Sequence, residues 1–200
     1  PLFMTLGVEK SPYCVEANGT TNRQIVNNVS KVIENDVAFP YSSLMKFKFA
    51  EHKNLPKFDL FWYDGGLKPK IPEELNRKDF NLPAEGMMFI GDKGKILAGF
   101  RCEKPELITK SKMRNHIDEV NEQKVNVHKK ENIWIESFIN NQESPGSFLK
   151  AKAITETILL GAVALRARRR LFYDSKKMKI TNHEDSNKYL YRNYRKGWEL

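Results

Sequence analysis

Strand-like patterns fill the first half of the chain, and the one long helical pattern begins only after residue 147. Apolar residues recur at helical spacing over 148–168. The expected buried stripe consists of Ile154, Ile158, Leu159, Ala162 and Leu165. Gly161 interrupts this stripe, which predicts close packing against a neighbouring element. Strands followed by helices predict an α+β domain with one open, mainly antiparallel or mixed β-sheet and helices on one face.

Local patterns place the remaining elements. Strands are expected at 13–19, 39–49, 58–63, 86–91 and 95–100. Helices are expected at 2–7, 132–140, 148–168 and 183–195, a weak helix or a loop at 20–38, and irregular segments at 51–57, 67–84 and 103–130. Asp92-Lys93-Gly94 indicates a hairpin turn, Gly7 closes the first helix, and Ser147 is expected to cap the long helix.

The totals are those of a globular protein. Two hundred residues can bury a sizeable core and suit a single domain over residues 1–200. The net charge of +9 comes from basic residues spread along the chain, so we expect a solvated surface and no nucleic-acid partner. No apolar run approaches the roughly 18 residues of a membrane span. Cys14 and Cys102 lack metal or redox spacing, and the sequence leaves open whether they pair.

Motifs that bind nucleotides or metals are missing from the sequence. It contains no Gly-x-Gly-x-x-Gly and no phosphate-binding loop, and its four histidines do not pair at ligand spacing. No Ser or Cys lies in a nucleophile elbow. The sequence therefore predicts no catalytic, cofactor-binding or metal-ligating residue in this chain.

One strand end carries side chains suited to a sugar-like ligand. Trp62, Tyr63 and Asp64 precede Gly65-Gly66. Aromatic rings stack on sugar faces, and a carboxylate accepts hydrogen bonds from hydroxyl groups, so these three residues are candidate substrate-binding residues. A packed strand end with a turn after it explains the same residues, and both interpretations stay open.

Three further features have structural interpretations. The segment 182–187 could bind a polar ligand, although Asn182 also suits a helix N-cap. Glu156 lies near the apolar stripe of the long helix and is expected to make a buried hydrogen bond. The aromatic and basic segment 194–200 predicts a tail that packs on a neighbouring surface.

In their order along the chain, several segments resemble the C-terminal part of Gfo/Idh/MocA-family oxidoreductases, in the subgroup common in Bacteroidetes and Planctomycetes. The matching segments are Trp62 to Leu67 with Pro69, Pro72 to Leu75, Gly86 to Gly94, Ser144 to Phe148, Thr155-Glu156, Leu159 to Gly161, and Asn182, Asn187, Arg195, Gly197 and Trp198. The resemblance covers nearly the whole chain.

The resemblance implies a protein of two parts. An N-terminal Rossmann domain would bind NAD or NADP, while a C-terminal domain would cover the substrate with one sheet face and form an oligomer with the other. Residues 2–7 resemble the segment just after the family's Asp/His helix, so we expect the Rossmann domain, and any export signal, upstream of Pro1. Glu103-Lys104-Pro105 matches the spelling of the family's catalytic tripeptide, but it lies after a hairpin, and we interpret it as a coincidence.

The resemblance also implies an activity. The whole protein would be an NAD(P)-dependent oxidoreductase acting on a hydroxyl group of a sugar, cyclitol or glycoside. This chain would then be inactive alone and would form a homo-oligomer through its sheet. Two alternatives stay open: an NAD-dependent glycosidase of the same family, and a non-enzymatic binding or assembly module. The compartment, cytoplasmic or periplasmic, is undetermined.

Overall fold

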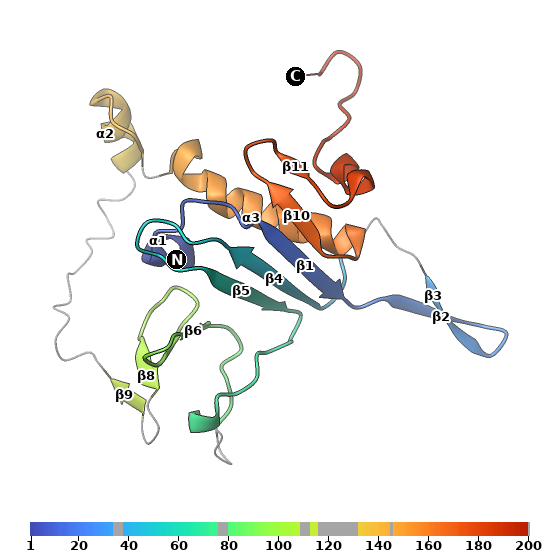
Figure 1. Ribbon diagram of the computed structural model, residues 1–200, viewed down its shortest axis with the longest axis horizontal. Coiled ribbons are helices and arrows are strands. Elements are labelled where there is room, and N and C mark those ends of the chain that lie inside the picture. The colour runs from blue at the N-terminus through green and yellow to red at the C-terminus, as the bar shows by residue number, and fades with distance from the viewer. Residues whose placement is uncertain (34–37, 76–79, 109–112, 116–131, 145, 200) are drawn as a thin grey trace. The chain divides into compact units, whose positions relative to one another are not determined.

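The chain divides into two compact units in the computed structural model, which describes residues 1–33, 38–75, 80–108, 113–115, 132–144 and 146–199 (Figure 1). One unit combines residues 1–7 with 68–150, and the other combines 8–67 with 151–200. His116, His128 and most of the expected excursion over 103–130 lie outside the described residues. The expectation that residues 1–200 form one C-terminal domain stays a prediction.

A five-stranded sheet forms the centre of the second unit. Its strands are β1 (Cys14–Gly19), β4 (Ser43–Phe49), β5 (Phe58–Asp64), β10 (Leu171–Asp174) and β11 (Lys179–Ile180). Their order is β11-β10-β1-β4-β5, and neighbouring strands pair antiparallel. The mainly antiparallel sheet confirms that part of the predicted fold class. The prediction that the strands precede the long helix is wrong, because β10 and β11 come after it and β10 pairs with β1.

Helix α3 (Phe148–Ala167) packs on this sheet through its small residues. Its buried residues are Ala153, Thr157, Leu160, Gly161, Val163 and Ala164. The predicted stripe is wrong at its centre, because Ile158 and Leu159 are 65% and 59% exposed. Four of the six buried residues, Ala153, Thr157, Gly161 and Ala164, are small and let the helix approach the sheet closely, whereas Ile158 and Leu159 are turned outward.

Gly161 sets the distance between the helix and the sheet. A β-carbon at this position would lie 2.7 Å from Sδ of Met45 and 3.0 Å from Cζ of Phe47 on β4. The predicted close packing at Gly161 is therefore confirmed. The predicted cap is also present, since the Lys150 amide donates to Oγ of Ser147 at 3.3 Å.

A separate ribbon extends beyond β1 and β4. It consists of β2 (Asn22–Val26) and β3 (Val29–Ile33), and all ten residues are exposed (Figure 1). The helix or loop predicted over 20–38 is wrong here. Asn27 and Asn28 adopt φ of 52° and 63°, which is the left-handed conformation of a two-residue hairpin turn. Asparagine tolerates this conformation. The sequence-based prediction missed the hairpin because it did not identify Asn27-Asn28 as a turn.

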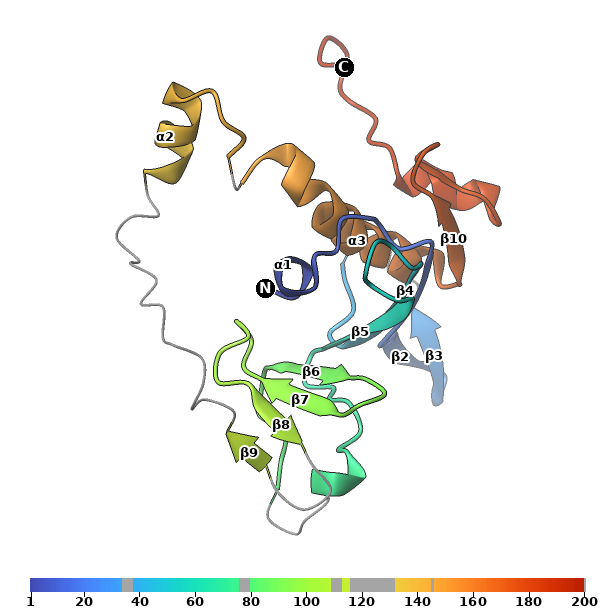
Figure 2. The ribbon, with the colours of Figure 1, turned by 60° about the vertical axis from the view of Figure 1, so that its left-hand side comes forward.

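The first unit contains a four-stranded antiparallel meander, visible in Figure 2. Its strands are β6 (Met87–Ile90), β7 (Lys95–Ala98), β8 (Glu106–Ile108) and β9 (Met113–Asn115). The β6–β7 hairpin confirms the prediction at Asp92-Lys93-Gly94. The surface excursion predicted from residue 103 is wrong at β8, where Ile108 is buried. Lys95 on β7 forms an ion pair with Glu74 at 2.7 Å.

The same unit contains two short helices and a 3-10 turn. These are α1 (Leu2–Leu6), α2 (Ile133–Ile139) and η1 (Glu73–Leu75). Gly7 ends α1 with φ of 64°, as predicted. Both helices predicted in these regions are confirmed.

The segment after β11 differs most from its prediction. A 3-10 helix, η3 (Glu184–Tyr189), replaces the helix expected over 183–195. Residues 191–199 are exposed, and Leu200 lies outside the described residues. The guanidinium of Arg195 lies 4.4 Å from the ring centre of Trp198, which is 64% exposed. Within the described residues the aromatic rings of the tail contact its own arginines, and its packing on a surface outside this chain stays a prediction.

We expect Gly161→Leu to lower the free energy of unfolding by about 3 kcal/mol, because the added side chain cannot fit between α3 and β4. Urea unfolding monitored by circular dichroism measures the change. Thr155→Leu is the matched control, since Thr155 is an exposed residue of the same helix. Equal stability of the two variants would contradict the close approach at Gly161.

Candidate functional site

The structure separates the three candidate residues at the end of β5. Trp62, Tyr63 and Asp64 pair with Met45, Leu44 and Ser43 of β4. Since successive side chains of a strand point to opposite faces, Trp62 and Asp64 lie on the face of Met45, which α3 covers at Gly161. Tyr63 lies on the opposite face, which we call the open face. The three side chains therefore do not form one site, but Trp62 and Asp64 share a face.

Asp64 is held by the turn that begins at Gly65. Its Oδ1 accepts a hydrogen bond from the Gly65 amide at 2.7 Å, and Ser42 Oγ donates to the Gly65 carbonyl at 2.9 Å. Gly65 has φ of 64°, and a β-carbon there would lie 2.1 Å from the Tyr41 carbonyl oxygen. The turn thus orients an exposed carboxylate beside Trp62, which is 47% exposed. An indole ring and an oriented carboxylate can stack on a sugar ring and accept a hydrogen bond from its hydroxyl group.

The open face combines aromatic rings with paired charges. The rings of Phe61 and Tyr63 are 6.5 Å apart. Lys46 pairs with Asp59 at 2.7 Å and lies 5.0 Å from the centre of the Phe61 ring. Aromatic residues are enriched at protein interfaces, whereas lysine and aspartate are depleted there, so of these groups only the Phe61 and Tyr63 rings resemble an interface.

Arg170, the residue before β10, forms an ion pair with Glu16 of β1. The guanidinium donates two hydrogen bonds to Oε2 of Glu16, at 2.9 and 3.1 Å. Glu16 raises the pKa of Arg170, so this residue stays charged. The basic run 168–170 begins directly after α3, which ends at Ala167, and Arg168 has φ of 51°. Of the three arginines, Arg170 is the one that forms this ion pair.

The cysteines carry no chemistry in this structure. Cys14 and Cys102 are free thiols in this structure. Burial raises the pKa of Cys14, the dominant cause being loss of solvation. A neutral thiol is a weak nucleophile, so Cys14 packs as a small apolar residue.

Glu156 has the structural role expected of it. Ser11 donates a hydrogen bond to its Oε2, and Lys152 lies 3.9 Å from Oε1. Burial, and after it the nearby Glu156 carboxylate, raises the pKa of Tyr173 on β10. These groups stabilise the contact of α3 with the sheet, and they offer no nucleophile to solvent.

Asn182 and Asn187 bind the backbone of their own chain. The Asn182 side chain accepts from the Phe172 amide at 2.8 Å and donates to the Arg170 carbonyl at 2.9 Å. Asn187 bonds both the amide and the carbonyl of Ile180, at 2.8 and 3.0 Å. The predicted N-cap at Asn182 is wrong, because His183 occupies the N-cap position of η3. Both amides are used structurally, so they do not form a ligand site.

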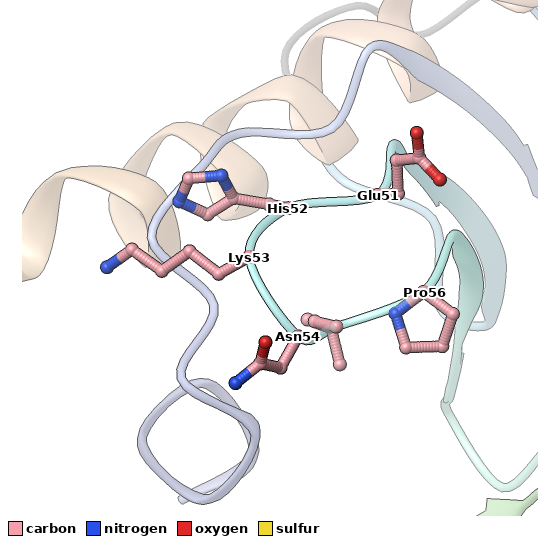
Figure 3. A pocket seen from close by; sticks show the side chains of 6 residues that line it. Glu51, His52, Lys53, Asn54 and Pro56 are labelled. Carbon is pink, nitrogen blue, oxygen red and sulfur yellow. The ribbon is translucent and has the colours of Figure 1, made fainter.

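A hollow of about 460 Å³ lies at the β4–β5 turn, lined by residues 51–56 (Figure 3). His52 and Lys53 point to one side of the turn, whereas Glu51 and Pro56 lie on the other. Glu9 receives two hydrogen bonds from Lys53 Nζ, at 2.6 and 2.7 Å, which together with His52 hold the pKa of Glu9 below its usual value. The polar groups diverge, so the hollow is a turn and not a binding site.

Within the described residues, no cluster of three or more His, Cys, Asp or Glu side chains can hold a metal ion.

Glu103-Lys104-Pro105 belongs to a turn. In it the Gly99 amide donates to the Glu103 carbonyl at 2.9 Å, and Glu103 Oε2 accepts from the Arg101 amide at 2.6 Å. This turn does not lie at a helix N-terminus, and the sequence contains no Gly-x-Gly-x-x-Gly motif of the kind that binds a dinucleotide pyrophosphate. No helix in the described part of the chain is long and apolar enough to span a bilayer.

Comparison with known protein families identifies the larger part of the chain. The family model described as "Oxidoreductase family, C-terminal alpha/beta domain" matches residues 72–200, more than half of the sequence. This range includes the meander, α3, β10 and β11, whereas Trp62 and Asp64 precede it. A comparison with curated proteins gave no match.

We expect Asn187→Ala to destabilise the protein by about 2 kcal/mol, because two hydrogen bonds to Ile180 are lost and their backbone partners are partly buried. Thermal unfolding measures the loss. Asn193→Ala is the control, since Asn193 is an exposed residue of the segment after η3. If Asn187 instead bound a ligand, the alanine variant would keep its stability and lose binding.

Proposed function

This chain belongs to the Gfo/Idh/MocA oxidoreductase family, as its C-terminal alpha/beta domain, and on that premise we propose that it covers the substrate of a nicotinamide-dependent enzyme. The reaction would move a hydride between NAD or NADP and a hydroxyl carbon of a sugar, cyclitol or glycoside. The observation that carries the substrate class is the exposed Trp62 indole beside the Asp64 carboxylate that the Gly65 turn orients.

We assign the redox chemistry to another part of the protein. The sequence contains no Gly-x-Gly-x-x-Gly motif that would hold a dinucleotide pyrophosphate. A Rossmann domain preceding residue 1 would hold the cofactor and the proton-transfer residues. In this proposal the present chain contributes binding, orientation and exclusion of water.

The two faces of β5 suggest two separate roles, one in substrate binding and one in oligomerisation. Trp62 and Asp64 lie on the face that α3 partly covers, near the free edge of the five-stranded order, and would contact the substrate. Tyr63 lies with Phe61 on the open face, which would form the interface of a homo-oligomer. Aromatic residues and arginine are enriched at such interfaces, and Arg170 lies beside Glu16 of this sheet.

The first test separates this chain from its proposed cofactor domain. We expect isothermal titration calorimetry to detect no NAD or NADP binding by residues 1–200, and micromolar binding by the protein that includes the preceding residues. The physical reason is that the 200 residues lack a glycine-rich turn at a helix N-terminus. Micromolar binding by residues 1–200 alone would contradict the proposal.

The second test uses the separation of Trp62 from Tyr63. In the protein with both domains, Trp62→Ala is expected to raise KM for the sugar about tenfold, because the stacking contact between the indole ring and the sugar is lost. Tyr63→Ala is the matched control on the opposite face and should leave KM unchanged. Equal effects of the two variants would exclude the Trp62–Asp64 face as the substrate contact. Release of free sugar without a net change in NADH would identify the glycosidase alternative.

A further inference from the structure

The ribbon of β2 and β3, residues 22–33, has no packing partner in the described chain, and we call it the arm. Its ten strand residues are exposed, and five of them are isoleucine or valine: Ile25, Val26, Val29, Val32 and Ile33. Ile25 is 75% exposed and Val29 is 57% exposed. Exposed aliphatic residues on such a contiguous segment indicate an interaction site.

An isolated two-stranded ribbon is at best marginally stable in water. The arm has a favourable turn at Asn27-Asn28 and many β-branched residues, which define its strands. Its apolar groups nevertheless stay in water on both faces, because Ile25 and Val26 are neighbours on one strand and point in opposite directions. A partner that encloses the arm would bury both sets of side chains.

The arm is a direct extension of the central sheet. Gly19, the last residue of β1, pairs with Ser43 of β4, and the Thr20 amide donates to the Ser42 carbonyl at 3.0 Å. The arm strands begin two residues later, and Figure 1 shows them beyond the ends of β1 and β4. The arm is therefore placed at the margin of the open face by backbone hydrogen bonds.

The open face alone is small for a stable dimer. Five strands of at most seven residues form it, and at about 4.8 Å between strands and about 3.3 Å per residue its flat area is at most about 550 Å². The relief of the side chains raises the accessible area, whereas the four-residue β10 and the two-residue β11 reduce it. Stable interfaces bury about 800 Å² per partner, so additional contact area is required.

We propose that the arm clasps a second copy of this chain and completes the homo-oligomer interface of the open face. In a two-fold dimer each copy contributes one arm, so the added aliphatic area is counted twice. The open face of a second copy carries both signs of charge, with Glu16, Asp59 and Asp174 beside Lys46, Lys48 and Lys179, so the shortage of contact area, and not charge, supports a second copy as the partner. This inference rests on the proposed homo-oligomer.

Sedimentation velocity across a concentration series tests the arm. The variant Ile25→Ser/Val29→Ser removes one aliphatic residue from each strand, and we expect its dimer dissociation constant to rise at least about tenfold. Ile158→Ser is the matched control, since Ile158 is an isoleucine of α3 with similar exposure, 65%. The control should keep the wild-type constant, and circular dichroism should show the same fold in all three proteins.

A second variant, Phe61→Ser on the open face, distinguishes an error in the arm proposal from an error in the homo-oligomer proposal. Wild-type protein that stays monomeric at every concentration overturns both the arm and the homo-oligomer. A wild-type dimer weakened by Phe61→Ser but not by Ile25→Ser/Val29→Ser overturns the arm alone. A dimer weakened by both variants and not by Ile158→Ser supports both.

Amide hydrogen exchange gives a local readout that does not depend on the variants. In a clasped dimer, peptides covering 22–33 should exchange at least about tenfold more slowly at high protein concentration than at low concentration, since dimerisation removes open states of the ribbon. Peptides of α3 should exchange at the same rate at both concentrations. Concentration-independent exchange in the arm of a dimeric protein would overturn the proposal.

Discussion

The close approach of α3 to β4 at Gly161 determines which surfaces of the sheet are available. Without a side chain at this position, the helix lies within van der Waals distance of Met45 and Phe47. That contact covers one face of the sheet and leaves the other, with Phe61 and Tyr63, open. The proposed division of β5 into a substrate face and an interface face depends on this single contact.

Backbone hydrogen bonds fix much of the structure around the sheet. Asn187 replaces a missing strand partner for Ile180, and Asn182 binds the backbone of Arg170 and Phe172 at the start of β10. The Gly65 turn likewise orients Asp64 through its own amide. Polar residues that first suggest ligand contacts therefore divide into two groups: Asn182 and Asn187 are used by the fold, while Asp64 is directed to solvent beside Trp62.

Local patterns predicted the elements whose stability is local. The β6–β7 hairpin, the end of α1 at Gly7, the Ser147 cap and the close packing of Gly161 were all correctly predicted, because a turn, a cap or a missing side chain is specified by a few adjacent residues. The β10 strand and the buried side of α3 were not. β10 has four residues and depends on pairing with β1, more than 150 residues earlier in the chain, which no local pattern reports. Ile158 and Leu159 have helical spacing, yet apolar character alone does not distinguish a large outward residue from a small inward one.

By itself the sequence determined a globular chain with a mainly antiparallel sheet, one long helix and no nucleotide or metal motif, and its family resemblance agrees with the match over residues 72–200. These properties depend on composition, spacing and short motifs. Only the tertiary structure decided that α3 covers the face of Trp62 and Asp64 and not that of Tyr63, that the segment after η3 is exposed, and that residues 22–33 form an arm. These results depend on strand register and on contacts between residues distant in the chain, because a shift of one residue in register moves every side chain to the opposite face.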